Sequence, residues 1–157
     1  MPHLRTAVTG LLLALSLALA PAGAAPQNPA EEAIAYRQSV YRVLEWNVRP
    51  LGAMVKGTAP YDPALFASRA SRVAALTPML LEGFAPGSYL KGKTSAREAI
   101  WSDRTTFEGL LQKLSLKSAA LADAARANDL AAAKPAFNDL VQVCKDCHKQ
   151  FRERDRD

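Results

Sequence analysis

Apolar residues recur at spacings of three and four along most of the chain, which is the period of a helix that buries one face. Two such stretches occupy the first half. The first begins near Glu31, and the second follows a cap at Asp62 and runs to about Leu81. Their apolar positions are Ala33, Tyr36, Val40, Val43, Leu44 and Val48, then Leu65, Phe66, Val73, Leu76 and Leu80.

Prolines bear on where these two helices begin and end. Pro63 stands directly after Asp62, at the first helical position, where a missing N–H costs nothing. Pro50 is expected either to end the first helix or to kink it, with Leu51–Lys56 continuing along the same axis in the second case. The stretch 57–60 reads as the connection between the two helices.

The second half of the chain repeats the pattern. A third helix is predicted from about Ile100 to Ala127. A fourth follows a turn at residues 128–129 and runs to about Arg154, interrupted or restarted at Pro135. Their apolar positions are Phe107, Leu110, Leu111, Leu114 and Leu121, then Phe137, Leu140, Val141, Cys144, Cys147, His148 and Phe151.

The connections complete this picture. Residues 83–95 form the one long polar loop, marked by Pro86, Gly87 and Gly92. No segment alternates with a period of two, so no strand is expected. Four helices with otherwise short connections predict an all-α fold, an antiparallel four-helix bundle with a cofactor held in its core.

The N-terminal segment has a different composition. Met1–Ala24 has the features of a secretory signal peptide, with a charge at Arg5, an apolar run over residues 11–20 and the small residues Ala22 and Ala24 flanking the cleavage position. Cleavage after Ala20 also fits the pattern but places Pro21 after the cut. The apolar run is shorter than the roughly 20 residues that span a bilayer, which favours removal over a retained anchor.

Cleavage leaves residues 25–157, enough for one domain with its own core. The chain carries a formal net charge of +5, and losing Arg5 lowers it to +4. Because these charges are spread along the sequence, they do not indicate nucleic-acid binding. The mild basicity favours acidic redox partners, which the sequence does not identify.

Candidate chemistry is concentrated in the last predicted helix, which contains Cys144-Lys145-Asp146-Cys147-His148. Cys-x-x-Cys-His is the attachment motif of a c-type haem. Cysteines three residues apart lie on one side of a helical turn, where both thiols can add to the vinyl groups of a porphyrin. His148, rotated by about 100°, can bind the iron as a neutral imidazole.

Three other interpretations of the two cysteines are weaker. A thioredoxin-like pair sits where a strand turns into a helix, and no strand pattern precedes Cys144. A structural zinc site needs four ligands, and the chain adds only His3, in the segment predicted to be removed. A simple disulfide leaves the adjacent His148 unexplained. Haem c attached through Cys144 and Cys147 is therefore predicted, and together with the export signal it indicates the periplasm.

The sixth iron ligand is the open question at this point. Only nine residues follow His148, and none is methionine or histidine. A further ligand must therefore come from earlier in the chain, where Met54, Met79 and the lysines are the candidates. Core or rim packing is the commoner role for a methionine near a helix end.

The sequence as a whole resembles the cytochrome c′ family, the class II c-type cytochromes. The matching pieces cover the chain after the signal peptide. They are Tyr36-Arg37-Gln38-Ser39, Met54-Val55-Lys56-Gly57, Pro60-Tyr61-Asp62, Ile100-Trp101-Ser102-Asp103, Cys144-Lys145-Asp146-Cys147-His148 and Phe151-Arg152.

The resemblance implies five-coordinate, high-spin iron bound only by the motif histidine. In such proteins a side chain from the first helix covers the opposite face of the haem, and Tyr41 has that position here. A sister group that resembles cytochrome c-556 has methionine there and is six-coordinate and low-spin, so the tyrosine favours an open iron.

The spacing in the first helix agrees with this assignment. Arg37 and Tyr41 share a helical stripe with Leu44 and Val48. Four residues rise about 6 Å, close to the distance from a haem centre to its propionate edge. Tyr41 is therefore expected to cover the iron while Arg37, with Gln38 beside it, contacts a propionate. A solvated surface charge for Arg37 and ordinary core packing for Tyr41 are the alternatives.

Arg152 is a candidate on the proximal side. It follows His148 by four residues, so in a continuous helix it would share that face and approach the imidazole. The family pattern has an arginine at this place. The alternative is a solvated charge that interacts favourably with the helix dipole.

Two functions follow from the resemblance. The first is a periplasmic haem protein that binds nitric oxide (NO) and carbon monoxide (CO) and protects against nitric oxide. The second is an electron carrier. An enzyme is not predicted, since no acid–base group stands out beside the iron. Members of this family often form dimers through their first two helices, and Trp46 is an aromatic that would suit such a contact, so a homodimer is expected.

Overall fold

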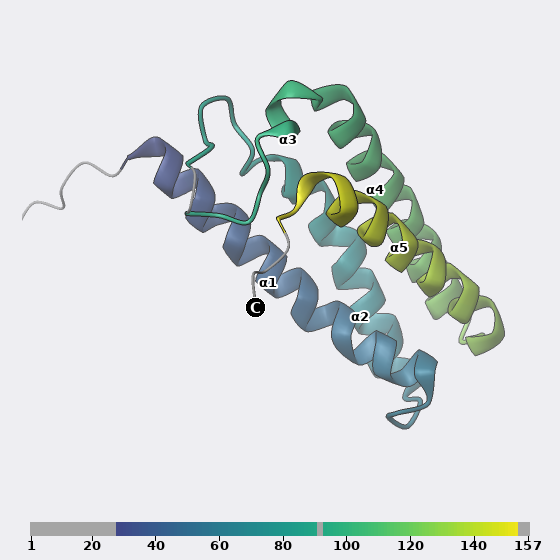
Figure 1. Ribbon diagram of the computed structural model, residues 1–157. Coiled ribbons are helices and arrows are strands. Elements are labelled where there is room, and N and C mark those ends of the chain that lie inside the picture. Colours follow the sequence, from purple (N-terminus) through teal and green to yellow (C-terminus); the bar gives the residue numbers. More distant parts are fainter. Residues whose placement is uncertain (1–27, 91–92, 154–157) are drawn as a thin grey trace, which may run out of the picture.

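The computed structural model describes residues 28–90 and 93–153 (Figure 1). The helices are α1 (Pro29–Lys56), α2 (Pro63–Leu76), the 3₁₀ helix η1 (Thr77–Leu81), α3 (Ala99–Ser102), α4 (Arg104–Arg126) and α5 (Leu130–Phe151). The four long helices form the predicted all-α four-helix bundle. The predicted signal peptide, Met1–Ala24, lies outside the described residues.

Three of the four long helices begin where a side chain accepts hydrogen bonds from the first backbone N–H groups. Asn28 caps α1, Asp62 caps α2 as predicted, and Asp129 caps α5. Each provides an acceptor for donors that have no partner within the helix. Gly57 ends α1 with φ +74°, a left-handed conformation that glycine adopts without steric cost.

Pro50 does not end α1. A proline has no N–H, so the carbonyl oxygen of Trp46, four residues earlier, lacks its usual helical donor. Arg69 of α2 replaces that donor, because its Nη1 lies 3.0 Å from the Trp46 carbonyl oxygen. Its guanidinium also lies 5.9 Å from the centre of the Trp46 ring. The second helix therefore supports the first across its proline.

The second predicted helix changes character near its end. Pro78 removes the donor that the Ala74 carbonyl would otherwise have, and the chain tightens into η1 from Thr77. The Thr77 hydroxyl donates to that carbonyl over 3.0 Å. Pro135, by contrast, lies inside α5 without interrupting it.

The third predicted helix is two helices. It breaks at Asp103, whose φ and ψ of −120° and 55° are not helical. The short α3 therefore leads into α4 at an angle (Figure 1). Periodicity alone did not indicate this break, since apolar residues flank it on both sides.

The buried face of α1 differs from its predicted stripe. Val43 is 48% exposed, whereas Arg37 and Asn47 are each only 3% exposed. In α2, Leu65 is 40% exposed while Phe66 is fully buried. The core is made mainly by Leu51, Phe66, Val73, Leu80, Ile100, Phe107, Leu121 and Leu140.

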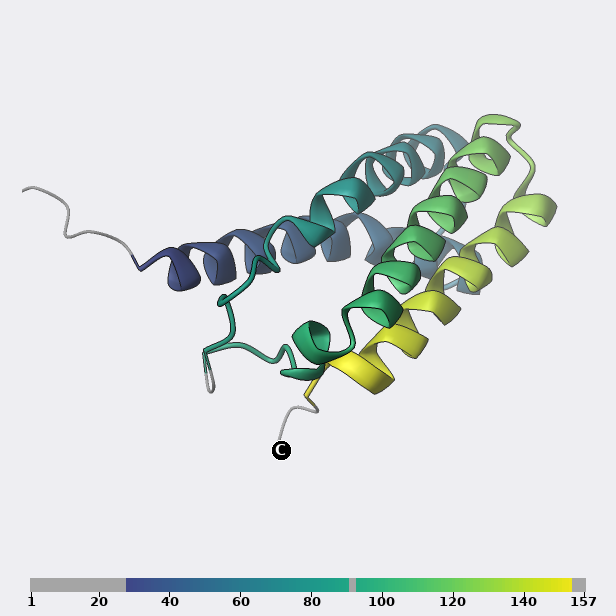
Figure 2. The same ribbon diagram turned by 90° about the horizontal axis from the view of Figure 1, so that it is seen from above.

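Each long helix packs along its neighbour in the order α1, α2, α4, α5, while α1 and α5 meet over a short region. At that region Gly52 lies against Phe137, because a Cβ at position 52 would be 3.2 Å from the ring. From there α1 and α5 diverge toward the end of α5 (Figure 2). Within the described residues, no helix has the length and apolarity needed to cross a membrane.

Candidate haem site

Cys144 and Cys147 lie well inside α5 as free, half-buried thiols. They share the face of α5 that carries Phe137, Leu140, Val143 and Phe151, and both pack against the core while staying partly accessible. This agrees with the prediction that the two cysteines lie on the buried face. His148, by contrast, is exposed.

The surroundings of these groups change their acidity. Burial raises the pKa of the Cys144 thiol, and burial followed by the neighbouring Cys144 raises the pKa of Cys147 to about 11. The ring of His148 is partly covered by protein, and this desolvation together with the Arg152 charge lowers its pKa. A neutral imidazole is the form that binds iron.

The three alternative interpretations find no support in this arrangement. The two thiols are not joined, and they lie in the interior of a long helix rather than at a strand-to-helix turn. In the part of the chain that the structure describes, no three His, Cys, Asp or Glu side chains gather to hold a metal ion.

Tyr41 of α1 lies close to both thiols although it is about a hundred residues away in sequence. Burial is the main reason that the pKa of its phenol is raised, and the nearby Cys147 and Cys144 raise it further. Arg37 acts in the opposite direction. The Tyr41 ring meets Phe84 edge to face, with centroids 6.2 Å apart. The structure thus brings Tyr41 of α1 close to the two motif cysteines of α5.

Arg37 is buried, contrary to the solvated alternative. Its Nη1 donates to the carbonyl oxygens of Gly83 and Ser88 over 2.9 and 3.0 Å, and to the Ser88 hydroxyl over 3.2 Å. Its guanidinium also lies 5.0 Å from the centre of the Phe84 ring and 5.6 Å from that of Trp101. Burial lowers its pKa.

Two nitrogens of this guanidinium, Nε and Nη2 of Arg37, are buried without a hydrogen-bond partner. A buried cation with spare donors is costly unless an anion or acceptor reaches it. A haem carries two propionate carboxylates, and a carboxylate matches two guanidinium donors. The half-buried thiols, the neutral imidazole and these spare donors therefore fit a covalently attached haem between α1 and α5.

Gln38 and Arg152 are the remaining candidate residues from the sequence. Gln38 is exposed, and its Nε2 is 3.4 Å from the Lys93 carbonyl oxygen. Arg152 is not on the helical face of His148, because α5 ends at Phe151 and Arg152 adopts an extended conformation. Its charge nevertheless lies near enough to lower the pKa of His148.

Met54 and Met79 are the candidate methionines for the sixth iron position. Met54 follows Tyr41 by 13 residues on α1, which corresponds to about 20 Å along the helix axis, and its side chain belongs to the core. Met79 is 37% exposed on η1. Neither position suits a ligand for iron held beside Tyr41.

Loop residues around the site were missed by sequence reasoning. Phe84 packs against Tyr41, Trp101 and Phe107. Its carbonyl oxygen accepts from Arg104, and the next one, of Ala85, accepts from the Trp101 indole. Gly83 lies so close to α1 that a Cβ there would be 2.5 Å from the Arg37 Cβ. A loop has no period to reveal such contacts, and an isolated glycine was the only signal.

A four-helix bundle with a Cys-x-x-Cys-His motif near the end of its last helix defines a c-type haem protein of the cytochrome c′ type. The family model described as cytochrome c′ matches residues 32–152, so the chain belongs to the cytochrome c′ family.

Known relatives agree over most of their length. Cytochrome c′ of Rubrivivax gelatinosus is 32% identical over 128 residues, which is 82% of this chain and 98% of the relative. The solved cytochrome c prime of Shewanella frigidimarina is 39% identical, with a TM-score of 0.77 over 82% of this chain and 98% of that one.

A third relative was solved with a ligand. It is the nitric oxide complex of a variant of cytochrome c prime from Alcaligenes xylosoxidans, 32% identical with a TM-score of 0.74. The match covers 80% of this chain and 96% of that one.

Proposed function

We propose that this protein carries one haem c and binds nitric oxide and carbon monoxide at an open iron site. In this proposal Cys144 and Cys147 form the thioether bonds, and His148 is the only protein ligand of the iron. The haem supplies an iron centre that binds such gases and accepts or gives single electrons. The observation that carries the proposal is the position of Tyr41 beside both motif cysteines, on the helix opposite His148.

Tyr41 covers the open side of the haem without binding the iron. Its half-buried ring is held by Phe84 from the loop side, so an incoming gas must displace it. A ligating tyrosine is a phenolate, and the buried position disfavours that anion. Steric hindrance of this kind slows ligand entry. It should favour nitric oxide, which binds ferrous iron most strongly, over dioxygen, which finds no well-placed donor.

Arg37 holds a propionate with the two donors that its own protein contacts leave free. Gln38 is the exposed neighbour on the same turn and can reach the same edge of the haem. Arg152 places a positive charge near the proximal imidazole, on the side of His148.

The second candidate function is electron transfer. A dedicated carrier of this kind would have six-coordinate, low-spin iron and resemble cytochrome c-556. The exposed position of His148 supports electron exchange at the surface, since a haem edge near solvent is accessible to a redox partner. The positions of Met54 and Met79 argue against the six-coordinate form.

Visible spectra of the ferric and ferrous protein, with and without carbon monoxide, test the open site. High-spin bands that change on adding carbon monoxide are expected, and low-spin spectra that carbon monoxide leaves unchanged would contradict the proposal. Acid–acetone extraction should leave the haem attached.

The covering role of Tyr41 has a sharper test. Tyr41→Ala should bind carbon monoxide faster by about tenfold or more, if the ring costs about 1.4 kcal/mol of activation. Tyr36→Ala, the same truncation on the same helix, is the control and should leave the rate unchanged. An unchanged rate in Tyr41→Ala would show that the ring does not hinder entry.

Residues 1–24 are proposed to export the chain to the periplasm and to be removed there. Cell fractionation and N-terminal sequencing of the purified protein test this directly. A mature protein that begins at residue 25 is expected, and retention of Met1 in the cytoplasm would contradict export.

A second copy of the chain is proposed to cover the outer face of α1 and α2. Trp46 is 70% exposed there and Val43 is 48% exposed, beside a hollow of about 490 Å³. The hollow is lined by Arg42, Val43, Glu45, Trp46, Arg49, Pro50 and Arg69. A two-fold arrangement can pair the acid of one copy with the arginines of the other.

Sedimentation at micromolar concentration tests the dimer. Trp46→Glu should shift it toward the monomer, because a charge replaces the most exposed aromatic of the face. Leu116→Glu is the control, since Leu116 is 73% exposed on α4. A wild-type protein that sediments only as a monomer would contradict the proposal.

A further inference from the structure

The last turn of α5 ends without a glycine cap, although it carries His148. A helix leaves its final four carbonyl oxygens without a donor from the helix itself. Here these belong to His148, Lys149, Gln150 and Phe151. Only the first is satisfied by the adjoining chain, because the Arg152 N–H donates to the His148 carbonyl oxygen over 3.2 Å.

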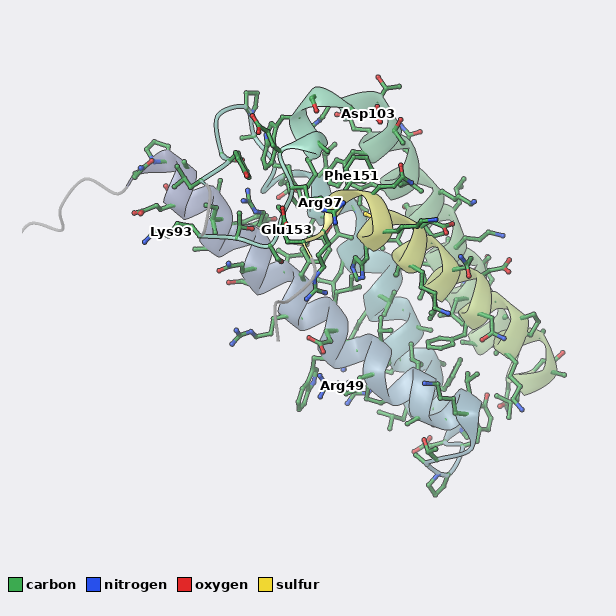
Figure 3. All side chains as sticks on the ribbon, in the orientation of Figure 1. Arg49, Lys93, Arg97, Asp103, Phe151 and Glu153 are labelled. Carbon is green, nitrogen blue, oxygen red and sulfur yellow. The ribbon has the colours of Figure 1, made fainter. Side chains whose placement is uncertain are left out.

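The other three carbonyl oxygens all take their donor from Arg97, which precedes α3. Its backbone N–H donates to Phe151 over 2.9 Å. Its Nη1 is 3.4 Å from the Lys149 carbonyl oxygen and 3.3 Å from that of Gln150. Figure 3 shows Arg97 beside Phe151 and Glu153 at this end of α5.

Neighbours of Arg97 hold the chain beyond the helix. Ala96 forms an antiparallel bridge with Arg152, and the Glu153 N–H donates to the Ser95 carbonyl oxygen over 2.7 Å. Earlier in the same segment, Gln38 of α1 reaches the Lys93 carbonyl oxygen. The segment before α3 thus joins the end of α5 to α1.

We propose that Arg97 is a positioning residue for the proximal side of the haem site. It fixes the turn of α5 that presents the His148 imidazole and the backbone that places Arg152. This inference rests on the proposed function, in which His148 binds the iron. A helix end whose carbonyl oxygens lose their donors opens more often, and a ligand histidine depends on its surroundings for its orientation.

Arg97→Ala tests this, with Arg97→Lys as the variant that retains a cation able to donate to the carbonyl oxygens. Arg126→Ala is the matched control, because Arg126 is an arginine in the last turn of α4. Two measurements are compared. They are amide hydrogen exchange at Arg152 and Glu153, and the iron–histidine stretching band of the ferrous protein in resonance Raman spectra.

In Arg97→Ala, exchange at both amides should become about five- to thirtyfold faster, the factor for losing one or two kcal/mol. The iron–histidine band should shift or broaden as the imidazole loses its fixed orientation. Arg97→Lys should recover most of both effects, and Arg126→Ala should show neither.

Faster exchange with an unchanged iron–histidine band would overturn the proposal, since Arg97 would then cap the helix without positioning the ligand. Unchanged exchange would overturn it as well. A wild-type ferrous protein that lacks the band would instead contradict the five-coordinate site. In that case the reduction potential of the haem is measured in place of the iron–histidine band. A shift in Arg97→Ala that Arg97→Lys reverses would support positioning, and an unshifted potential would overturn it.

Discussion

The two ends of the bundle are held together by different interactions. Where α1 crosses α5, Gly52 lies against Phe137 and fully buried apolar residues such as Leu51 and Phe66 fill the space. Where α1 and α5 diverge, side-chain donors from the helices bind loop carbonyl oxygens, as Arg37 does at Gly83. We call these the apolar end and the polar end.

Two arginines, half-buried Arg69 and buried Arg37, show what the difference means. At the apolar end Arg69 supplies the donor that Pro50 removes from the Trp46 carbonyl oxygen. At the polar end Arg37 serves two carbonyl oxygens and a hydroxyl and still has two buried nitrogens without a partner. Arg69 leaves one buried nitrogen, Nε, without a partner and lines the outer hollow of α1 and α2. The two spare nitrogens of Arg37 belong to the guanidinium that is proposed to hold a propionate. Stability should therefore depend most on the apolar end, and haem chemistry on the polar end.

The largest expected effect is at the apolar end. Phe66 is fully buried, so Phe66→Ala should lower the free energy of unfolding by about 3–5 kcal/mol. Leu65→Ala is the neighbouring control and should cost much less, since Leu65 is 40% exposed. Urea unfolding measures both. The haem spectrum of the folded Phe66→Ala protein should match wild type, and an altered spectrum would mean that the two ends are not separable.

At the polar end, Arg37→Met should lower the free energy of unfolding by about 2–3 kcal/mol, because buried carbonyl oxygens of Gly83 and Ser88 lose their donor. Unlike the apolar truncation, it should also alter the haem spectrum by removing the propionate contact. Arg72→Met, which removes an exposed arginine of α2, is the control. A stability loss with an unaltered spectrum would show that Arg37 serves only the loop.

A smaller effect is expected from the proline support. Arg69→Ala leaves the Trp46 carbonyl oxygen without its donor and should cost about 1 kcal/mol. In a Pro50→Ala background, the new backbone N–H can donate to that carbonyl oxygen, so the same substitution should cost less. A double-mutant cycle by urea unfolding gives the coupling. If Arg69→Ala lowers the free energy of unfolding equally with and without Pro50→Ala, Arg69 does not compensate for the N–H that Pro50 lacks.

The sequence predicted most reliably what a local pattern encodes. The four long helices follow from periodicity, the cap at Asp62 from residue type, and the haem motif from the spacing of Cys144, Cys147 and His148. The family resemblance paired Tyr41 with the iron, and the structure brings that residue to the motif cysteines.

What failed depended on contacts between distant segments. Pro50 could end or kink a helix, and the donor that replaces its missing N–H comes from Arg69 of α2. The burial of Arg37 depends on a loop without periodicity. The predicted apolar stripe of the first helix included Val43, which is 48% exposed, and did not include the buried Arg37. The approach of Arg152 to His148 was expected from a continuous helix. It occurs although α5 ends at Phe151, where the N–H of Arg97, more than fifty residues earlier, donates to the last carbonyl oxygen.

The smallest expected effect concerns a contact at the start of the polar-end loop. The Tyr36 hydroxyl of α1 donates to the carboxylate of Glu82, and this hydrogen bond is the main reason that the Tyr36 pKa is raised. A raised pKa means that the folded state favours the protonated phenol. The contribution to stability is therefore fully present below the unfolded pKa of about 10 and is lost as pH rises through the folded pKa.

Urea unfolding of wild type and Tyr36→Phe between pH 7 and pH 11 should show a small difference in the free energy of unfolding that disappears at the alkaline end. The contributions of the other tyrosines cancel in this comparison. In a Glu82→Gln background the acceptor charge is gone, so the same comparison should no longer depend on pH in this way. A difference between wild type and Tyr36→Phe that persists unchanged to pH 11 would show that the phenol stabilises the fold by packing rather than by its hydrogen bond to the loop.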